Sequence, residues 1–310
     1  SLYGRTAALT PKHPHRKLLE KLHGYGITGN LLKWIEDFLT GRKSRVKVNG
    51  SSSDWCEVLS GVPQGSVLGP LLFLIFVNDL PASIKSSIKM FAGDTKMWRV
   101  IKCEDDKRIL QSDLDELSKW SDRWLLELNQ DKCRVMYIGD NTQNKYELRN
   151  ASGTHVLIET VKEKDLGILV KNDLKPSSQC SAAASKATSM MGLVKRHFKD
   201  LDSDSFLLLY KTYIRPHLEY CVQPWSPHLK KDILLLETVQ KKSTKLVRGF
   251  KNLPYHRRLE KLGLSTLEER RERGDLLQAY KIITGKDRID CAQFFQPARK
   301  EHDLRGHNLK

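Results

Sequence analysis

The chain has 310 residues, of which 39% are hydrophobic and 29% are charged. This composition excludes a disordered chain, and the length predicts two domains or one domain with an appendage. Lys and Arg outnumber Asp and Glu by 53 to 37, which gives a formal net charge of +16. Such an excess favours a polyanionic partner, with nucleic acid as the first candidate. The alternative is a basic surface that serves solubility alone.

The six cysteines are widely spaced, and none forms a Cys-x-x-Cys pair. This argues against a zinc site and a compact disulfide framework, and it predicts a reducing, intracellular compartment, cytoplasmic or nuclear. The longest strongly apolar run, 71–77, is too short to cross a bilayer, so we expect no membrane partner. The chain begins with Ser1 instead of Met, and we expect it to be a fragment.

The first third of the chain predicts mixed helix and strand. Apolar residues recur at helical spacing over 15–39, with glycines breaking the middle of the run. Val46 and Val48 alternate with basic residues, and Asn49-Gly50 marks a turn, so a hairpin with 55–59 is expected.

A more strongly apolar segment follows. Residues 66–80 predict a buried helix that Pro81 closes. Residues 88–91 and 95–100 predict a hairpin around Gly93-Asp94, and Ser112 is the expected cap of a long helix.

The rest of the chain is expected to be mainly helical after one hairpin. The hairpin is predicted from 156–158 and 166–170, and the predicted helices are 181–196, 206–214, 233–248 and 266–284.

An acidic turn, Ala92-Gly93-Asp94, is the first candidate for chemistry. Taken alone it is equally well an ordinary turn, because Gly and Asp are common in turns. It follows a Gly-Pro-Gln loop that starts at Gly61 and an apolar helix, and this order favours the remnant of a catalytic site.

That order of elements resembles the polymerase core of reverse transcriptases from non-LTR (LINE-type) retrotransposons. His13-Pro14-His15-Arg16-Lys17-Leu18-Leu19 resembles a helix start of the same family, 128–132 its lysine segment and 165–168 its primer-grip hairpin. The resemblance is specific over 13–140, moderate over 145–249, and extends into 250–310.

The resemblance implies an α+β fold, an incomplete right-hand polymerase palm followed by a helical thumb and tail. We expect a partial palm in 1–140, a primer-grip hairpin and thumb-like region in 141–249, and a basic tail in 250–310. The implied activity is RNA-directed DNA polymerase, with magnesium as cofactor. The implied partners are an RNA template with a DNA primer, or an RNA–DNA duplex, and deoxynucleotide triphosphates.

The resemblance also assigns residues. Asp94 would be a metal ligand and catalytic, and Lys132 would donate a proton to the leaving pyrophosphate, although a solvated surface lysine is the alternative. The loop residues implied to contact nucleotide and template are Pro63, Gln64, Gly65 and Ser66, and the primer-grip residues are Leu166 and Gly167. For the loop, the alternative is a mere helix start with Ser66 as its cap.

Two departures from the family pattern predict impaired catalysis. Two-metal nucleotidyl transfer needs carboxylates that converge from two elements. The family's turn carries two adjacent aspartates, and the first is Gly93 in this chain. Residues 1–12 contain no Asp or Glu, and Pro11 stands where the family would place an aspartate. We therefore expect the first metal-ligand strand to be missing or degraded and the magnesium site to be incomplete.

A basic run near the end of one predicted helix is a candidate for nucleic-acid binding. Its members are Lys241, Lys242, Lys245 and Arg248. They suit phosphate contacts, while a solvated helix face is the alternative. Two further hypotheses therefore stand beside the polymerase: a nucleic-acid-binding remnant without catalysis, and a decaying element product without a selected role.

Overall fold

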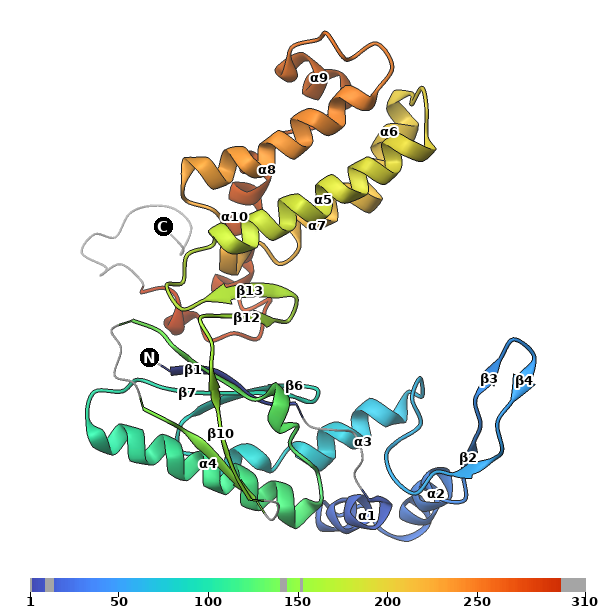
Figure 1. Cartoon of the computed structure of the whole chain (residues 1–310), viewed down its shortest axis with the longest axis vertical. Coiled ribbons are helices and arrows are strands. Elements are labelled where there is room, and N and C mark those ends of the chain that lie inside the picture. The colour runs from blue at the N-terminus through green and yellow to red at the C-terminus, as the bar shows by residue number, and fades with distance from the viewer. Residues whose placement is uncertain (1, 9–13, 140–143, 151–152, 297–310) are drawn as a thin grey trace. The chain divides into compact units, whose positions relative to one another are not determined.

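A computed structural model describes residues 2–8, 14–139, 144–150 and 153–296 (Figure 1). The chain divides into two compact units, 1–174 and 175–310. The segment 141–174, which we expected to accompany the helical region, belongs to the first unit. The described part of 250–310 belongs to the second unit together with the helices before it.

A five-stranded sheet organises the first unit. Its strand order is β11 (Ile158–Glu159), β8 (Arg134–Tyr137), β1 (Leu2–Ala8), β7 (Asp94–Arg99) and β6 (Ser87–Phe91). The central strand β1 is antiparallel to both of its neighbours, and the edge strand β11 is parallel to β8. The N-terminal segment is thus an interior strand of the sheet, which the sequence did not predict.

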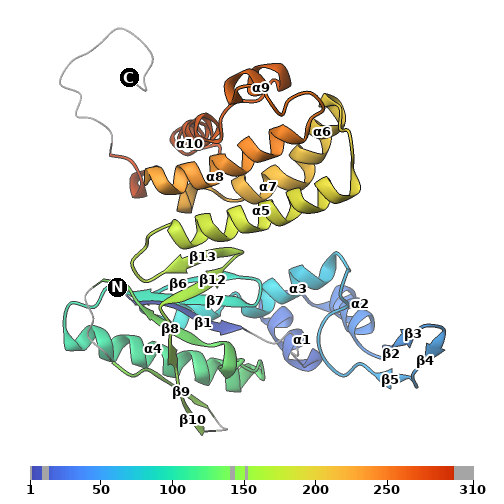
Figure 2. The ribbon, with the colours of Figure 1, turned by 45° about the horizontal axis from the view of Figure 1, so that its top comes forward.

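Helices complete this unit, and Figures 1 and 2 show α4 running along one face of the sheet. The helices are α1 (His15–Gly24), α2 (Gly29–Leu39), α3 (Leu68–Val77), α4 (Glu104–Trp124) and two short 3₁₀ turns, η1 (Leu80–Ser83) and η2 (Gln130–Lys132). Leu18, Phe76 and Leu117 are fully buried between them. The predicted helix over 15–39 is confirmed as two helices separated by the glycine-rich break.

A buried lysine ties three of these helices together. Lys21 on α1 is only 5% exposed, and its ammonium group pairs with Asp79 and donates to the Phe76 carbonyl. It lies 3.9 Å from the ring centroid of Trp124 and 4.7 Å from that of Trp120. Burial lowers the pKa of Lys21, opposed by Asp79. Cation–π contacts of this kind are strongest where water is excluded, so the lysine fixes α1 against α3 and α4.

The described residues of this unit also form four two-stranded pairs. They pair β2 (Lys43–Ser44) with β5 (Cys56–Glu57), β3 (Lys47–Val48) with β4 (Ser51–Ser52), β9 (Glu147–Asn150) with β10 (Gly153–Val156), and β12 (Lys162–Asp165) with β13 (Ile168–Lys171). The predicted Asn49-Gly50 turn is confirmed, with φ of 47° and 89°, but the strand before it pairs with 51–52 instead of the expected 55–59. The predicted pairing of 156–158 with 166–170 is wrong, because the two-residue turn at Leu166-Gly167 closes a local hairpin instead.

The helix predicted before Asp94 and the helix predicted after it both begin at residues other than those expected. The helix expected over 66–80 begins at Leu68 and ends at Val77, and Pro81 lies at the start of η1 instead of closing α3. Ser112 is not a cap, since α4 begins at Glu104 with Cys103 before it. The Asp106 carboxylate accepts the backbone N–H groups of Lys102 and Cys103, which starts the helix earlier.

The described residues of the second unit form helices and turns. The helices are α5 (Ser177–His197), α6 (Ser203–Leu209), a π-helical turn η3 (Tyr210–Ile214), α7 (Arg215–Glu219), α8 (Lys230–Ser243), α9 (Tyr255–Leu262) and α10 (Leu267–Ile283). Short 3₁₀ turns lie at η4 (Gln223–Trp225), η5 (Thr244–Leu246) and η6 (Cys291–Gln293). The helix predicted over 266–284 is confirmed as α10, and Thr266 is its N-cap, in a capping box with Glu269.

A buried polar network holds α8, α9 and α10 together. The Gln240 amide, fully buried on α8, donates to the hydroxyl of Tyr255 at 2.8 Å and to the carbonyl of Ser265 at 3.1 Å. Glu237 accepts the backbone N–H of Leu267 at 3.0 Å, at the start of α10. Burial raises the pKa of the Tyr255 hydroxyl, as does its bond to Glu237. Within the described part of the chain, no helix has the length and apolar character needed to cross a bilayer.

Candidate active site

Asp94 is the first residue of β7 and lies beside a tight turn. Phe91 of β6 pairs with Asp94, so Ala92 and Gly93 alone form the turn of the hairpin. Ala92 has a φ of 49°, a left-handed conformation that a residue with a Cβ rarely adopts. Such strained turns are maintained where the surrounding structure fixes them, as at binding and catalytic sites. The predicted hairpin is confirmed, and it presents one carboxylate.

The strand opposite Asp94 is β1, and it carries no acidic residue. Its sequence is Leu-Tyr-Gly-Arg-Thr-Ala-Ala, and its register pairs Ala8 with Asp94 and Arg5 with Lys96, with an irregularity between Arg5 and Ala7. We expected the first metal-ligand strand to be missing or degraded. A strand without an acidic residue is present beside β7, where it pairs with β7 on one side and β8 on the other. Pro11, where the family pattern places an aspartate, lies outside the described residues.

The Gly-Pro-Gln loop is anchored at its first residue. The carbonyl of Gly61 accepts hydrogen bonds from Arg42 Nη2 at 2.8 Å and from His15 Nε2 at 2.9 Å. Pro14, next to His15, forms a β-bridge with Ser60. Burial lowers the pKa of His15, and the Arg42 charge acts in the same direction. The predicted helix start and the predicted loop are thus neighbours in the fold.

Ser66 joins this loop to α3. Its hydroxyl donates to the Pro63 carbonyl at 2.7 Å and accepts the Gly69 N–H at 3.0 Å. A Cβ at Gly69 would lie 2.9 Å from both of those oxygens, so a glycine is required there. Ser66 has the capping role that the alternative interpretation gave it, whereas Gln64 and Gly65 are exposed at the tip of the loop. Gly65 has a φ of 82°.

The predicted primer-grip turn is tied to the strand that carries Asp94. Leu166 and Gly167 have φ of 44° and 90°, and they connect Asp165 of β12 to Ile168 of β13. Asp165 forms an ion pair with Lys96 of β7, and both side chains are largely buried, 17% and 16% exposed. Since alternate residues of a strand lie on one face, Lys96 shares its face with Asp94. Segments 69 residues apart in sequence are therefore brought to one side of the sheet.

Lys132, the predicted proton donor, is exposed at the end of η2. Its backbone N–H donates to Asn129 Oδ1 at 3.2 Å, which caps the short turn. The turn contacts β1. These contacts are compatible with the solvated lysine that we considered as an alternative.

Among the described residues, those around Asp94 do not fit a two-metal magnesium site. Hard divalent cations require several oxygen ligands, chiefly carboxylates. The turn supplies Asp94 but not a second aspartate, and β1 supplies none. Over the described ranges no three His, Cys, Asp or Glu side chains come together to hold a metal ion.

The predicted basic residues of the second unit are exposed at the end of α8 and the turns after it. They lie beside the end of α5, since Leu201 and Val247 form a parallel bridge and the Arg248 N–H donates to the Leu201 carbonyl at 2.8 Å. The α5 end carries Lys195, Arg196 and His197. Two basic runs that are distant in sequence thus become neighbours. Basic residues also suit helix C-termini for electrostatic reasons alone.

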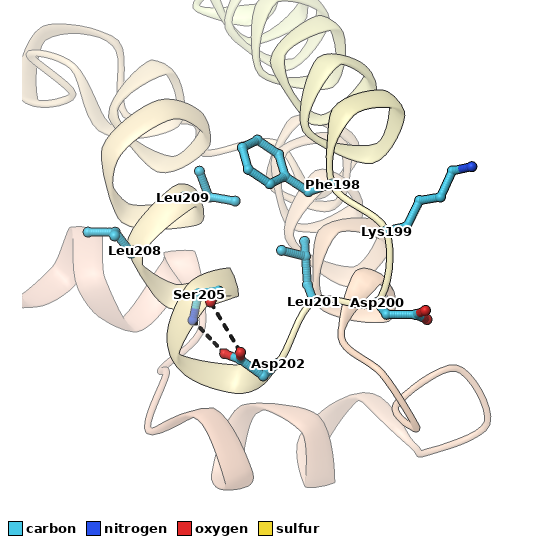
Figure 3. A pocket seen from close by; sticks show the side chains of 8 residues that line it. All are labelled: Phe198, Lys199, Asp200, Leu201, Asp202, Ser205, Leu208 and Leu209. Atoms are coloured by element: carbon cyan, nitrogen blue, oxygen red, sulfur yellow. Dashed lines mark hydrogen bonds between the residues drawn. The ribbon is translucent and has the colours of Figure 1, made fainter.

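A hollow of about 340 Å³ lies at the turn between α5 and α6. Figure 3 shows Phe198 and Leu201 directed toward it, while Lys199 and Asp200 point away. The Asp202 carboxylate is occupied in capping α6 through Ser205 (Figure 3). The hollow is therefore a gap in apolar packing without a set of groups for chemistry.

Sequence reasoning did not identify His15 and Arg42 as anchors of the loop. His15 stands in the motif that carried the family resemblance, but nothing local to it indicates a partner 46 residues away. The buried Lys21 was missed for the same reason. For His15 and Lys21, the sequence feature that could have indicated a buried role was a polar residue on an otherwise apolar helix face.

Comparison with known proteins identifies the class. The sequence profile of the family described as reverse transcriptase (RNA-dependent DNA polymerase) matches residues 13–191, more than half of the chain. The chain belongs to this family, and its relatives place it among reverse transcriptases of LINE-type elements.

Three relatives are insect mobile-element proteins. The chain is 28% identical over 248 residues to a probable RNA-directed DNA polymerase from transposon X-element of Drosophila melanogaster, covering 73% of this chain and 26% of the relative. It is 27% identical over 243 residues to the RNA-directed DNA polymerase from mobile element jockey of Drosophila funebris, covering 72% and 25%. It is 25% identical over 255 residues to a probable RNA-directed DNA polymerase from transposon BS of Drosophila melanogaster, covering 76% and 27%. The chain thus spans about a quarter of the length of these relatives.

Proposed function

We propose that this chain is an RNA-directed DNA polymerase domain that retains the framework for template and primer but has impaired nucleotide addition. The observation that carries the proposal is the pairing of β1 with β7, which places Ala8 opposite Asp94 and Arg5 opposite Lys96, with no acidic residue in β1. One carboxylate cannot hold two metal ions, so the step that depends on them is the one that is lost.

The parts that bind nucleic acid are better preserved than the metal site. The exposed Gln64 offers both a donor and an acceptor to a nucleotide or template base, and Gly65 permits close approach of its backbone. The turn at Leu166-Gly167 lies beside the sheet through the Lys96–Asp165 ion pair, which suits a role in gripping the primer end. Lys132 has the proposed role of proton donor only where the metal site is complete.

The second unit has the proposed role of a thumb. The residues that we assign to phosphate contacts are Lys241, Lys242, Lys245 and Arg248, next to the basic end of α5. The partners proposed for the whole chain are an RNA template with a DNA primer, or the RNA–DNA duplex that they form, and deoxynucleotide triphosphates when the site is complete. Phosphate neutralisation makes such binding strongly dependent on salt.

Binding and synthesis should be measured on the same preparation. We expect the purified chain to bind an RNA template annealed to a DNA primer, with an affinity that falls steeply across a salt series. We expect no primer extension with either magnesium or manganese. Template-dependent incorporation that disappears in Asp94→Ala would contradict the impaired site, and an absence of binding at low salt would contradict the retained framework.

A further inference from the structure

The hairpin that follows α2 forms an exposed arm of the first unit. We call residues 43–57 the basic ribbon. It consists of the β2–β5 and β3–β4 pairs, and Figures 1 and 2 show it extending away from α2 and α3. All its residues are exposed. A long two-stranded ribbon without a covering element has no packing role that would explain its side chains.

One arm of the basic ribbon carries three cations at alternate positions of the sequence. Lys43 lies in β2 and Lys47 in β3, and Arg45 stands between them in the two residues, 45–46, that belong to neither strand. The ribbon contains two acids, Asp54 and Glu57, and Glu57 is the strand partner of Lys43. Lys43 and Lys47 are four residues apart, roughly 13 Å along an extended backbone, which is close to twice the spacing of successive phosphates in an extended single strand.

An aromatic ring lies among these cations. The guanidinium of Arg45 stacks over the ring of Trp55 at 4.6 Å from its centroid, and the Trp55 side chain is 59% exposed. Planar Arg and Trp groups in water are surfaces on which an unpaired base can stack. A base inside a duplex cannot reach such a platform without leaving its own stack.

We infer that the basic ribbon binds single-stranded RNA, with phosphates at Lys43 and Lys47 and a base stacked on the Arg45–Trp55 pair. The inference deepens the proposed function, because it assigns a contact to the template strand before that strand is copied. It does not depend on catalysis. Val46 and Val48, exposed by 66% and 61%, alternate with these cations, and a protein docked on them is the competing outcome.

The charge contribution can be tested with a matched pair of variants. Lys43→Gln/Lys47→Gln removes two charges from the basic ribbon. Arg108→Gln/Lys119→Gln removes two charges from α4, where both side chains are more than two-thirds exposed. Binding of a uridine-rich RNA of about 20 nucleotides is followed by fluorescence anisotropy across a salt series. The ribbon variant should lower the log–log salt slope by about 1.4, at roughly 0.7 per phosphate on a single strand, and the control should leave it unchanged.

The stacking contribution has its own matched pair. Trp55→Leu should weaken binding of the same RNA by about tenfold with an unchanged salt slope, because stacking involves no counterion release. Trp34→Leu on α2 is the control, since Trp34 is 54% exposed and stacks on Phe38 instead of on a cation. Far-ultraviolet circular dichroism of all variants verifies that the fold is retained.

The outcomes separate this inference from the proposed function. The wild-type chain could bind an RNA–DNA duplex while both ribbon variants bind single-stranded RNA with the wild-type affinity. That result would leave the proposed function standing and overturn the role of the basic ribbon. Equal losses in the ribbon and α4 variants, or equal losses for single strands and blunt duplexes, also overturn it. A change in oligomeric state on Lys43→Gln/Lys47→Gln, seen by light scattering with RNA binding intact, would make the ribbon a protein interface. A wild-type chain that binds no nucleic acid would contradict both proposals.

Discussion

At the scale of single residues, the carbonyl of Gly61 shows how the fold positions the Gly-Pro-Gln loop. Two side chains from different elements, His15 and Arg42, donate to that one oxygen. The loop tip with Gln64 is exposed, so its position depends on this anchor and on the Ser66 hydroxyl. A neutral histidine suits this position, because a second cation beside Arg42 would be repelled in a poorly hydrated place.

This arrangement predicts a pH dependence of stability. The pKa of His15 is lowered in the folded chain, so the unfolded chain binds the proton more readily in the window just below the ordinary value of 6.5. The free energy of unfolding should therefore rise as the pH increases through that window and be fully developed above it. His15→Gln keeps a donor for Gly61 but does not titrate.

Urea denaturation at pH values from about 5 to about 7.5 tests the prediction. The wild-type chain should gain more stability over this range than His15→Gln. If the free energy of unfolding changed with pH in the same way for both proteins, the pKa of His15 would not be lowered as its surroundings imply.

At the scale of elements, local sequence patterns predicted most helices and the tight hairpins. The strands that depend on pairing between distant segments were not predicted correctly. The turn at Asn49-Gly50 was placed correctly, and the turn expected around Gly93-Asp94 lies one residue earlier, at Ala92-Gly93. Both turns could be located this closely because two-residue turns are specified by their own residues. β1 was missed, because its short, mixed sequence becomes a strand through partners on both sides, more than 85 residues away. The wrong pairing of 156–158 has the same origin, since register depends on contacts that no local pattern contains.

The start of α4 gives a direct test of one correction. Asp106→Ala should lower the melting temperature, because the Asp106 carboxylate accepts two backbone N–H groups and the Arg99 side chain. These bonds lower the pKa of Asp106 to about 2, so its contribution should persist at neutral pH and be lost only as the pH falls from about 4 toward 2.

Ser112→Ala serves as the control for the same helix. Ser112 is exposed within α4 and far from its start, so alanine should leave the melting temperature unchanged or raise it slightly through better helix propensity. Thermal unfolding of both variants decides between the two starts. If Ser112→Ala lowered the melting temperature more than Asp106→Ala, Ser112 would be the cap of the helix, as the sequence alone suggested.

At the scale of the whole molecule, the family was predictable from the sequence, but the state of the site required the fold. Gly93 and the absence of acids before His15 are visible in the sequence. Only the sheet shows that β1 pairs with β7, with Ala8 opposite Asp94. The grouping of Asp94 with the Leu166-Gly167 turn likewise depends on the Lys96–Asp165 pair. What sequence could not give was which distant segments share a face.

The central claim is that two walls of the metal site are deficient, and restoring them separately tests it. Gly93→Asp returns one carboxylate to the turn, where two adjacent like charges without a cation also repel. The register offers two β1 positions on the face of Asp94, so Gly93→Asp is combined with Ala8→Asp in one variant and with Arg5→Asp in another. Ligands that act as one unit have effects far from additive.

Primer extension on an RNA template with magnesium is the measurement that decides. We expect no extension by the wild-type chain or by Gly93→Asp alone, and template-dependent extension by a double variant, lost again when Asp94→Ala is added. Extension by Gly93→Asp alone that equals that of the double variants would contradict the account, because it would show that β1 needs no carboxylate.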